Sequence, residues 1–154
     1  MPTPFPPKLK LHHRTPGWIA AEATFHIRIR IDSRQSSTLT TPPIGNAVLD
    51  SASRYHEEQR WFCHLLVLMP DHLHALLAFP PLGSMSRLLG EWKRYHAQHQ
   101  AIAWQDGYFD HRIRNRREYD EKSAYIRLNP VAKNLCAQPE DWPWVIDATS
   151  LGIK

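Results

Sequence analysis

Cysteine is scarce in this chain, and long apolar runs are absent. Its 154 residues include only Cys63 and Cys136, which do not form a C-x-x-C pair. This argues against a zinc knuckle or a disulfide framework and fits a reducing cytoplasm. No segment approaches the ~18 consecutive apolar residues of a membrane span, and residues 1–7 lack the apolar core of a signal peptide. We therefore expect a cytoplasmic protein that does not bind a membrane.

Charge of one sign does not dominate either. The formal net charge is +4 at pH 7, with 42% hydrophobic and 22% charged residues, which is ordinary for one globular domain. This modest basic bias permits a nucleic-acid partner without requiring one. Residues 1–16 contain five prolines together with Lys8, Lys10 and Arg14. We therefore divide the chain into a basic, proline-rich arm (1–16) and a folded domain (17–154).

Three stretches predict β-strands. Residues 24–31 alternate strictly between apolar side chains and a polar set, Thr24, His26, Arg28 and Arg30. Residues 61–68 are almost continuously apolar, and a tight turn at 69–71 links them to a further apolar run from His72. The last two strands are expected to be antiparallel. A fourth strand near 107–114 would complete the sheet.

Three helices are expected as well. The first begins at Asn46 or Asp50 and runs to about residue 60, and the second begins at Ser84 or Ser86 and runs to about residue 100. The third runs from about 117 to 128 and ends at Asn129-Pro130, because the residue before proline is pushed out of the helical region. This order predicts an α+β fold, an antiparallel sheet with helices packed on one face.

The histidine strand carries the first chemical signal. Successive side chains of a strand point to opposite faces, so His72 and His74 share a face and can chelate one metal ion. Two hydrogen-bonded or partly exposed histidines have the same spacing, so the pattern alone leaves both interpretations open.

The last helix carries the second signal. Tyr125 and Asn129 are four residues apart and therefore share one helix face. The amide oxygen of Asn129 is a hard donor that could complete a site begun by the two histidines, and this mixed set suits Mg²⁺ or Mn²⁺ more than structural zinc. A buried helix tyrosine without a chemical role is the alternative.

Taken together, these segments resemble the REP-associated tyrosine transposases, small members of the HUH endonuclease group. The matching segments are Met-Pro-Asp-His-Leu-His at 69–74, an aromatic stretch at 104–110, Tyr125-Ile126 with Asn129-Pro130-Val131, and 139–143. Their order and spacing match over roughly residues 18–145, whereas the N-terminal segment matches no family pattern. The resemblance implies a ferredoxin-like or RRM-like HUH nuclease fold.

The resemblance also implies an activity. Proteins of this family cut single-stranded DNA, often beside an imperfect hairpin, with a tyrosine nucleophile and a divalent metal bound by the two histidines. Here it implies that Tyr125 attacks the scissile phosphorus, leaving a 5′-phosphotyrosyl link and a free 3′-hydroxyl, and that a second strand's 3′-hydroxyl can rejoin the DNA. The metal, Mg²⁺ or Mn²⁺, would be held by His72, His74 and Asn129.

Other residues are assigned by charge and position. Tyr119 would lie on a different helix face from Tyr125, while Tyr95 and Tyr108 fit core or base-stacking roles. Trp92 is a further candidate for stacking on unpaired bases. The predicted phosphate contacts are Arg28, Arg30, Lys93, Arg94, Arg112, Arg114, Arg116 and Arg117.

Two rival functions remain open from the sequence. A nucleic-acid-binding regulator would keep the fold and the basic surfaces but would not need Tyr125 or Asn129. A zinc hydrolase would use the histidine pair with another His or carboxylate ligand and no tyrosine nucleophile. The expected partner is single-stranded DNA with a hairpin, and the protein is expected in the cytoplasm, associated with the nucleoid, as a monomer or homodimer.

Overall fold

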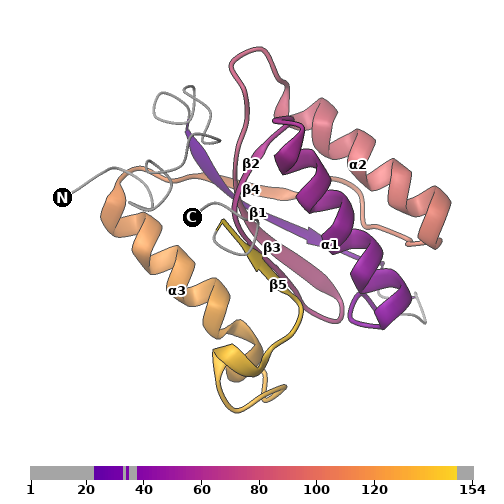
Figure 1. Ribbon diagram of the computed structural model, residues 1–154, viewed down its shortest axis with the longest axis vertical. Helices are drawn as coiled ribbons and strands as arrows, with labels where there is room; N and C mark the ends of the chain where they lie inside the picture. The colour runs from indigo at the N-terminus through magenta and orange to yellow at the C-terminus, as the bar shows by residue number, and fades with distance from the viewer. Residues whose placement is uncertain (1–22, 33, 35–37, 149–154) are drawn as a thin grey trace.

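A five-stranded sheet organises the structure (Figure 1). The computed structural model describes residues 23–32, 34 and 38–148, so the predicted basic arm at 1–16 lies outside the described residues. The elements in chain order are β1 (Thr24–Arg30), α1 (Pro42–Glu57), β2 (Phe62–Leu68), β3 (His72–Ala78), α2 (Met85–Gln100), β4 (Phe109–Arg112), α3 (Arg116–Ala132), a 3₁₀ turn (Pro139–Asp141) and β5 (Val145–Asp147).

The sheet has the strand order β4-β1-β3-β2-β5, and every neighbouring pair is antiparallel. The expected α+β class with an antiparallel sheet is therefore confirmed. The turn at 69–71 joins β2 to β3, as the sequence predicts, and Met69 N–H donates to the carbonyl oxygen of His72 at 2.8 Å. Strand β3 lies in the centre, between β1 and β2, where backbone hydrogen bonds hold it on both sides.

The helices, which were expected on one face of the sheet, divide between its two faces. Helices α1 and α2 cover one face, with Ile27, Leu66 and Leu73 beneath them, whereas α3 packs against the other through Tyr119 and Ile126. Every residue of β2 and β3 is buried. Because both strands carry apolar side chains on each face, each face needs cover, and a single helical layer would leave one face exposed to water.

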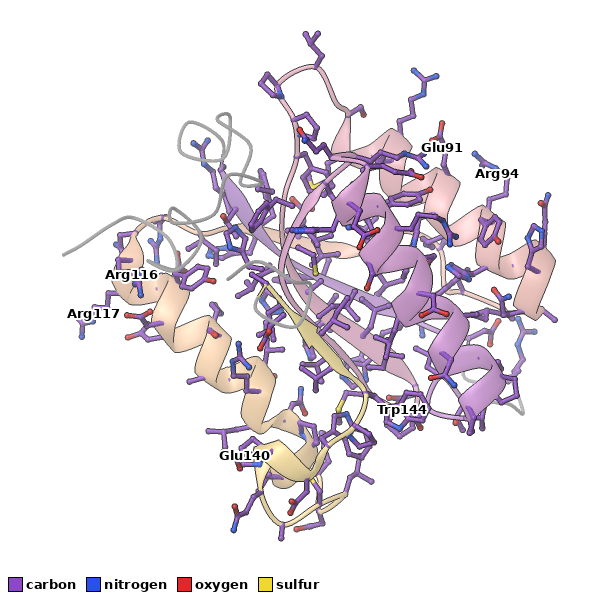
Figure 2. The ribbon with its side chains drawn as sticks, viewed as in Figure 1. Glu91, Arg94, Arg116, Arg117, Glu140 and Trp144 are labelled. Atoms are coloured by element: carbon purple, nitrogen blue, oxygen red, sulfur yellow. The ribbon has the colours of Figure 1, made fainter. Side chains whose placement is uncertain are left out.

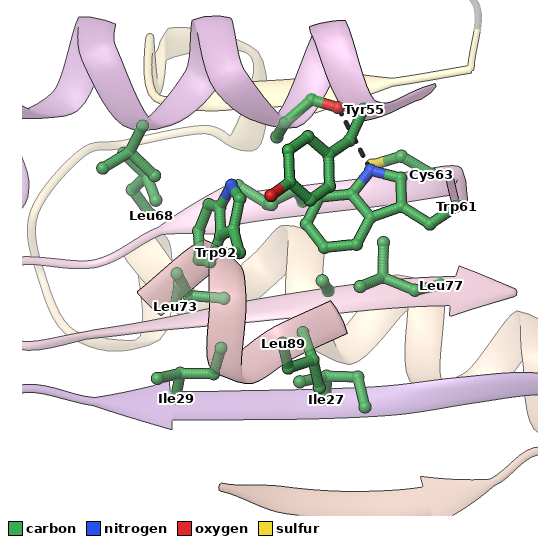
Figure 3. Close-up of a cluster of buried hydrophobic side chains, with 14 of the residues drawn as sticks. Ile27, Ile29, Tyr55, Trp61, Cys63, Leu68, Leu73, Leu77, Leu89 and Trp92 are labelled. Atoms are coloured by element: carbon green, nitrogen blue, oxygen red, sulfur yellow. Dashed lines mark hydrogen bonds between the residues drawn. The ribbon is translucent and has the colours of Figure 1, made fainter. Parts of the chain in front are cut away.

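The core between the sheet and the α1/α2 layer is rich in aromatic side chains (Figure 3). Trp61 and Trp92 pack edge to face with ring centroids 5.6 Å apart, and both are buried. The indole N–H of Trp92 donates to Ser51 Oγ at 2.8 Å, which satisfies its polar atom inside the core. Trp92 is therefore a core residue, and the prediction that it stacks on bases is wrong.

Two helix boundaries differ from the sequence prediction. Helix α1 begins at Pro42, several residues before Asn46, because proline lacks only an N–H that the first helical turn leaves unpaired. Helix α3 continues through Pro130 to Ala132. The turn after Pro130 is held by Lys133 N–H to the Asn129 carbonyl (3.0 Å) and Leu135 N–H to the Pro130 carbonyl (2.9 Å), which stabilises helical geometry beyond the proline.

The remaining elements follow the prediction more closely. Ser84 caps α2 by accepting the Arg87 backbone N–H at 3.2 Å, and the fourth strand is present as β4. The segment after the 3₁₀ turn also forms a short strand, β5, which pairs with the edge of β2. Within the described part of the chain, no helix is both long and apolar enough to cross a membrane.

Candidate functional site

The two histidines of the His-x-His pair lie on the central strand, on the face that α3 covers. In the β1–β3 pairing, His72 is opposite Arg30 and His74 is opposite Arg28. The His72 and His74 rings stand nearly perpendicular, with centroids 4.9 Å apart, and both residues are buried. The central strand β3 therefore presents two imidazoles, and the neighbouring strand β1 two guanidinium groups, on one face of the sheet.

A carboxylate orients the first histidine. His72 Nδ1 lies 2.6 Å from Asp71 Oδ1. Burial lowers the pKa of His72 despite the nearby carboxylate, and the hydrogen bond to His72 lowers the pKa of Asp71. At neutral pH a neutral His72 therefore donates its Nδ1 proton to an ionised Asp71, because a carboxylate can only accept. This tautomer leaves the lone pair of His72 on Nε2.

A third histidine, His26, contacts the other member of the pair, His74. His26 Nε2, from β1, lies 3.0 Å from His74 Nδ1. Burial lowers the pKa of His26 to about 4 and that of His74 to about 3, so both rings are neutral at pH 7 and share one proton in this bond. When His74 is the donor, its Nε2 carries a lone pair and can ligate a metal. The Nδ1 atom of His26 is buried and makes no hydrogen bond within the described part of the chain.

A cavity of about 410 Å³ brings the predicted chemical residues together. His72 and His74 line it from β3, and Tyr125 and Asn129 line it from α3. Tyr125 is 57% exposed, and its ring meets that of His74 edge to face at a centroid distance of 5.8 Å. Asn129, one turn later on the same helix, is buried. The phenol is therefore accessible from solvent and lies beside the histidines.

Basic side chains border the same cavity. Arg28 and Arg30 line it from β1, and Lys133 lines it from the end of α3. These three cations face a cavity that is also lined by two imidazoles and a phenol, with Asp71 as the one carboxylate that the described residues contribute to it. A phosphodiester fits this charge distribution, because cationic side chains bind phosphate oxygens and compensate their charge.

The donor atoms fit a divalent metal that accepts both nitrogen and oxygen ligands. The oriented histidine tautomers offer two ring nitrogens, and the buried Asn129 can offer an amide oxygen from the opposite side of the cavity. Among residues 23–32, 34 and 38–148, no three His, Cys, Asp or Glu side chains gather in a group suited to a metal. Those residues therefore offer no third His or carboxylate ligand of the kind that a zinc hydrolase would need beside the histidine pair.

Comparison with known proteins points to one family. The chain is 28% identical over 127 residues to the REP-associated tyrosine transposase of Escherichia coli strain K12, covering 79% of this chain and 74% of that protein. The solved structure of a REP-associated tyrosine transposase bound to a REP hairpin superposes with a TM-score of 0.69 at 24% identity, covering 80% of this chain and 75% of that one. The resemblance to the REP-associated tyrosine transposases is confirmed. No protein-family model matches the chain.

Among the tyrosines, Tyr119 and Tyr125 point to different faces of α3, as the sequence predicts. Tyr119 is buried against the sheet, and burial raises its pKa above the usual range. Tyr95 is 41% exposed and stacks on His99 of α2, which belongs to the layer on the other face of the sheet. Tyr108 packs partly buried against the core. Of these tyrosines and Tyr125, only Tyr125 lines the histidine cavity.

The predicted phosphate contacts divide into three places. Arg28 and Arg30 line the histidine cavity. Lys93 and Arg94 belong to α2, and Arg94 lies on the far side of the molecule from Arg116 and Arg117 (Figure 2). Lys93 instead has a structural role, because its Nζ donates to the carbonyl oxygens of Gln105 (3.0 Å) and Gly107 (2.7 Å).

The cluster at 112–117 lies near the start of α3 and does not line the histidine cavity. Arg112 is on β4 opposite Phe25. Three of these arginines form ion pairs with a carboxylate four residues later: Arg114 with Glu118, Arg116 with Asp120, and Arg117 with Glu121. A DNA contact here must therefore compete with these pairs, and the role of the cluster in DNA binding stays a prediction.

Asp71 and Lys133 line the cavity and His26 contacts His74, but the sequence pattern does not single out these three as site residues. The pattern indicates only a turn at Asp71 and only a place on the polar strand face for His26, and it gives no signal at Lys133. The strand alternation does place His26 and Arg28 on one face, but the β1–β3 pairing is needed to bring His26 to His74. A role for Asp71 at the site is easier to infer from the sequence, because Asp71 is adjacent to His72.

Proposed function

We propose that the protein is a metal-dependent, single-stranded DNA endonuclease and strand transferase that acts beside hairpin sequences through a tyrosine intermediate. The observation that carries the proposal is the convergence of Tyr125, His72, His74 and Asn129 on one cavity bordered by arginines. The likeness to the REP-associated tyrosine transposases supports a DNA-cleaving enzyme of the transposase kind.

The chain's own residues supply most of the chemistry. Arg28, Arg30 and Lys133 bind the phosphate oxygens at the cavity and hold the scissile phosphorus near Tyr125. The bond from Tyr125 Oη to phosphorus forms as the bond from phosphorus to the 3′ oxygen breaks. The phenol loses its proton, and the 3′ oxygen leaves as a hydroxyl. The phosphotyrosyl link conserves the phosphodiester, so that attack by another 3′-hydroxyl reverses the step.

His72, His74 and Asn129 would hold Mg²⁺ or Mn²⁺ in this cavity. When bound, the cation supplies Lewis-acid stabilisation of the charge that develops on the phosphoryl oxygens. Asp71 and His26 orient the two imidazoles through their Nδ1 atoms. The histidines therefore belong to the electrostatic part of the reaction, and Tyr125 is the nucleophile.

The experiment that tests the proposal is covalent capture. The protein is incubated with labelled single-stranded DNA from hairpin repeats flanking its own gene, with Mn²⁺ or EDTA, and resolved on a denaturing gel. We expect an adduct that requires Mn²⁺ and is absent in Tyr125→Phe, while this variant still binds the hairpin. His72→Ala and His74→Ala should each lose cleavage and metal dependence together.

Tyr119→Phe is the matched control, since this tyrosine lies on the same helix but faces the core. It should still form the adduct. DNA that is bound by the wild type but never cut or linked would favour the non-catalytic regulator. An adduct that persists in Tyr125→Phe would refute the nucleophile assignment.

A further inference from the structure

A second cavity, of about 350 Å³, meets the first at Arg28 and Arg30, which line both. Its other wall is the segment Gln105–Phe109, which leads into β4. The two arginines thus stand between the tyrosine cavity and this second hollow on the same face of the sheet. A DNA strand whose phosphate is bound by both arginines at the first cavity has its neighbouring nucleotide within reach of the second.

The second cavity contains a flat, accessible aromatic side chain. Phe109 is 39% exposed, although it is a large apolar residue. The guanidinium carbon of Arg28 lies 4.7 Å from the centroid of its ring, and the two residues are partners in the β1–β4 register. His26 meets Phe109 edge to face at 5.5 Å and links it to the ring of His74. Aromatic rings and arginine planes are the surfaces on which unpaired bases stack.

Hydrogen bonds from two sides hold the segment 105–109, which forms the wall of the second cavity. Gln105 N–H donates to the Arg30 carbonyl at 2.9 Å. From the other side, Lys93 Nζ donates to the carbonyl oxygens of Gln105 and Gly107. Gly107 has φ +73°, a conformation that glycine adopts without strain. The cavity is therefore formed before any ligand arrives, which lowers the entropic cost of binding.

The side chains of the segment 105–109 favour a base over a phosphate in the second cavity. The side chains of Gln105 and Asp106 are exposed and line the cavity. A carboxylate repels a phosphate, but it accepts hydrogen bonds from base N–H groups, and an amide both donates to and accepts from a base edge. The phosphate therefore belongs at Arg28 and Arg30, and the base belongs between Phe109 and Asp106.

We propose that this second cavity binds one unpaired nucleobase of the DNA strand, adjoining the scissile phosphate, stacked on Phe109 and Arg28 with its edge at Gln105 and Asp106. The inference rests on the proposed function and adds to it a site that reads sequence next to the cut.

The test is an abasic scan of the single-stranded flank of the hairpin DNA. Each flank nucleotide is replaced in turn by an abasic one, and binding to the full-length protein in EDTA is followed by fluorescence anisotropy. We expect one position next to the cut to weaken binding by about 5- to 150-fold, the range for loss of one stacked base. Phe109→Leu should weaken binding of the intact DNA similarly and show little further loss at that abasic position.

Tyr95→Leu is the matched control, because Tyr95 has nearly the same exposure as Phe109 but lies on α2. It should bind and respond to the scan as the wild type does. Asp106→Asn, at an exposed position that folding tolerates, should change which base is preferred at the sensitive position. Circular dichroism of each variant checks that the fold is retained.

The outcomes separate this inference from the proposed function. A wild-type protein that forms the adduct with Mn²⁺ but shows no sensitive flank position overturns the base site alone. Equal sensitivity of wild type and Phe109→Leu to the same abasic position also overturns it. A sensitive position without any adduct supports the base site and overturns only the cleavage, whereas loss of both binding and adduct overturns both.

Discussion

Removing the carboxylate of Asp71 is expected to weaken divalent-metal binding at His72 and His74 by about tenfold. Asp71 Oδ1 accepts the Nδ1 proton of His72 at 2.6 Å and thereby fixes the tautomer whose Nε2 is free to ligate. In Asp71→Ala, His72 must keep that proton on Nδ1 without a carboxylate acceptor in order to bind metal. The alternative tautomer places the proton on Nε2, where it blocks ligation.

The magnitude follows from the type and exposure of this bond. A hydrogen bond to a charged group contributes about 1.5–3 kcal/mol to stability. The Asp71 side chain is 70% exposed whereas that of His72 is 7% exposed, so water replaces part of the lost bond and the bottom of this range applies. About 1.4 kcal/mol corresponds to a tenfold change in affinity, which is the lower end of the effects seen for residues that orient metal-bound histidines.

The assay is titration with Mn²⁺, with free metal followed by electron paramagnetic resonance and the heat by calorimetry. Asp71→Asn should fall between wild type and Asp71→Ala, because its amide oxygen still accepts but carries no charge. Glu118→Gln is the matched control, since Glu118 accepts from His111 Nε2 at 2.7 Å outside the cavity. Unchanged Mn²⁺ affinity in Asp71→Ala, with His72→Ala abolishing binding, would refute the tautomer argument.

Two further predictions concern stability. His56 and His64 are buried, and burial lowers their pKa values to about 4 and about 3; below pH 6.5 the unfolded chain therefore binds protons that the folded chain does not. The free energy of unfolding, measured by urea titration in the presence of EDTA, should therefore fall by about 2 kcal/mol or more between pH 6.5 and pH 5. A free energy of unfolding that stays constant within about 0.5 kcal/mol over this range would contradict the prediction. Gly45→Ala places a methyl group against the Trp144 ring and 2.8 Å from the Leu39 carbonyl oxygen, so it should destabilise by about 1–3 kcal/mol. Gly90→Ala is the control: it lies in α2 with nothing within 4 Å of the new methyl group, so it should stabilise the fold by about 0.5–1 kcal/mol. An equal effect of the two substitutions on the free energy of unfolding would be inconsistent with the packing around Gly45.

The local pattern of the sequence predicted the parts of the site that depend on one element. Strict alternation over 24–31 predicted strand β1 and the shared face of Arg28 and Arg30. The spacing of Tyr125 and Asn129 placed them on one face of α3, where both line the same cavity. Such periodicities follow from backbone geometry alone, so no tertiary information was needed.

The features that depend on two distant elements could not be predicted in this way. Three features depend on tertiary structure: the division of the helices between two faces, the hydrogen bonds from Lys93 to the segment 105–107, and the hydrogen bond between His26 and His74. Lys93 illustrates the reason: its charge and its place on an amphipathic helix are equally compatible with a DNA contact and with backbone carbonyls as partners. Only the approach of α2 to that segment decides between them, and burial then lowers the pKa of Lys93.

One helix both closes the second face of the sheet and carries the proposed nucleophile, Tyr125. Tyr119 and Ile126 of α3 cover Leu65, Val67 and Leu76, while Tyr125 turns outward at the edge of the covered area, beside His74. The histidines themselves stand on β3, which is paired on both sides and buried throughout. The proposed metal ligands on β3 are therefore held by the sheet, whereas the position of Tyr125 depends on how α3 packs. Trimming Ile126 to alanine should for this reason lower the rate of covalent capture more than it lowers Mn²⁺ affinity, and equal losses in both would mean that the two halves of the site do not move independently.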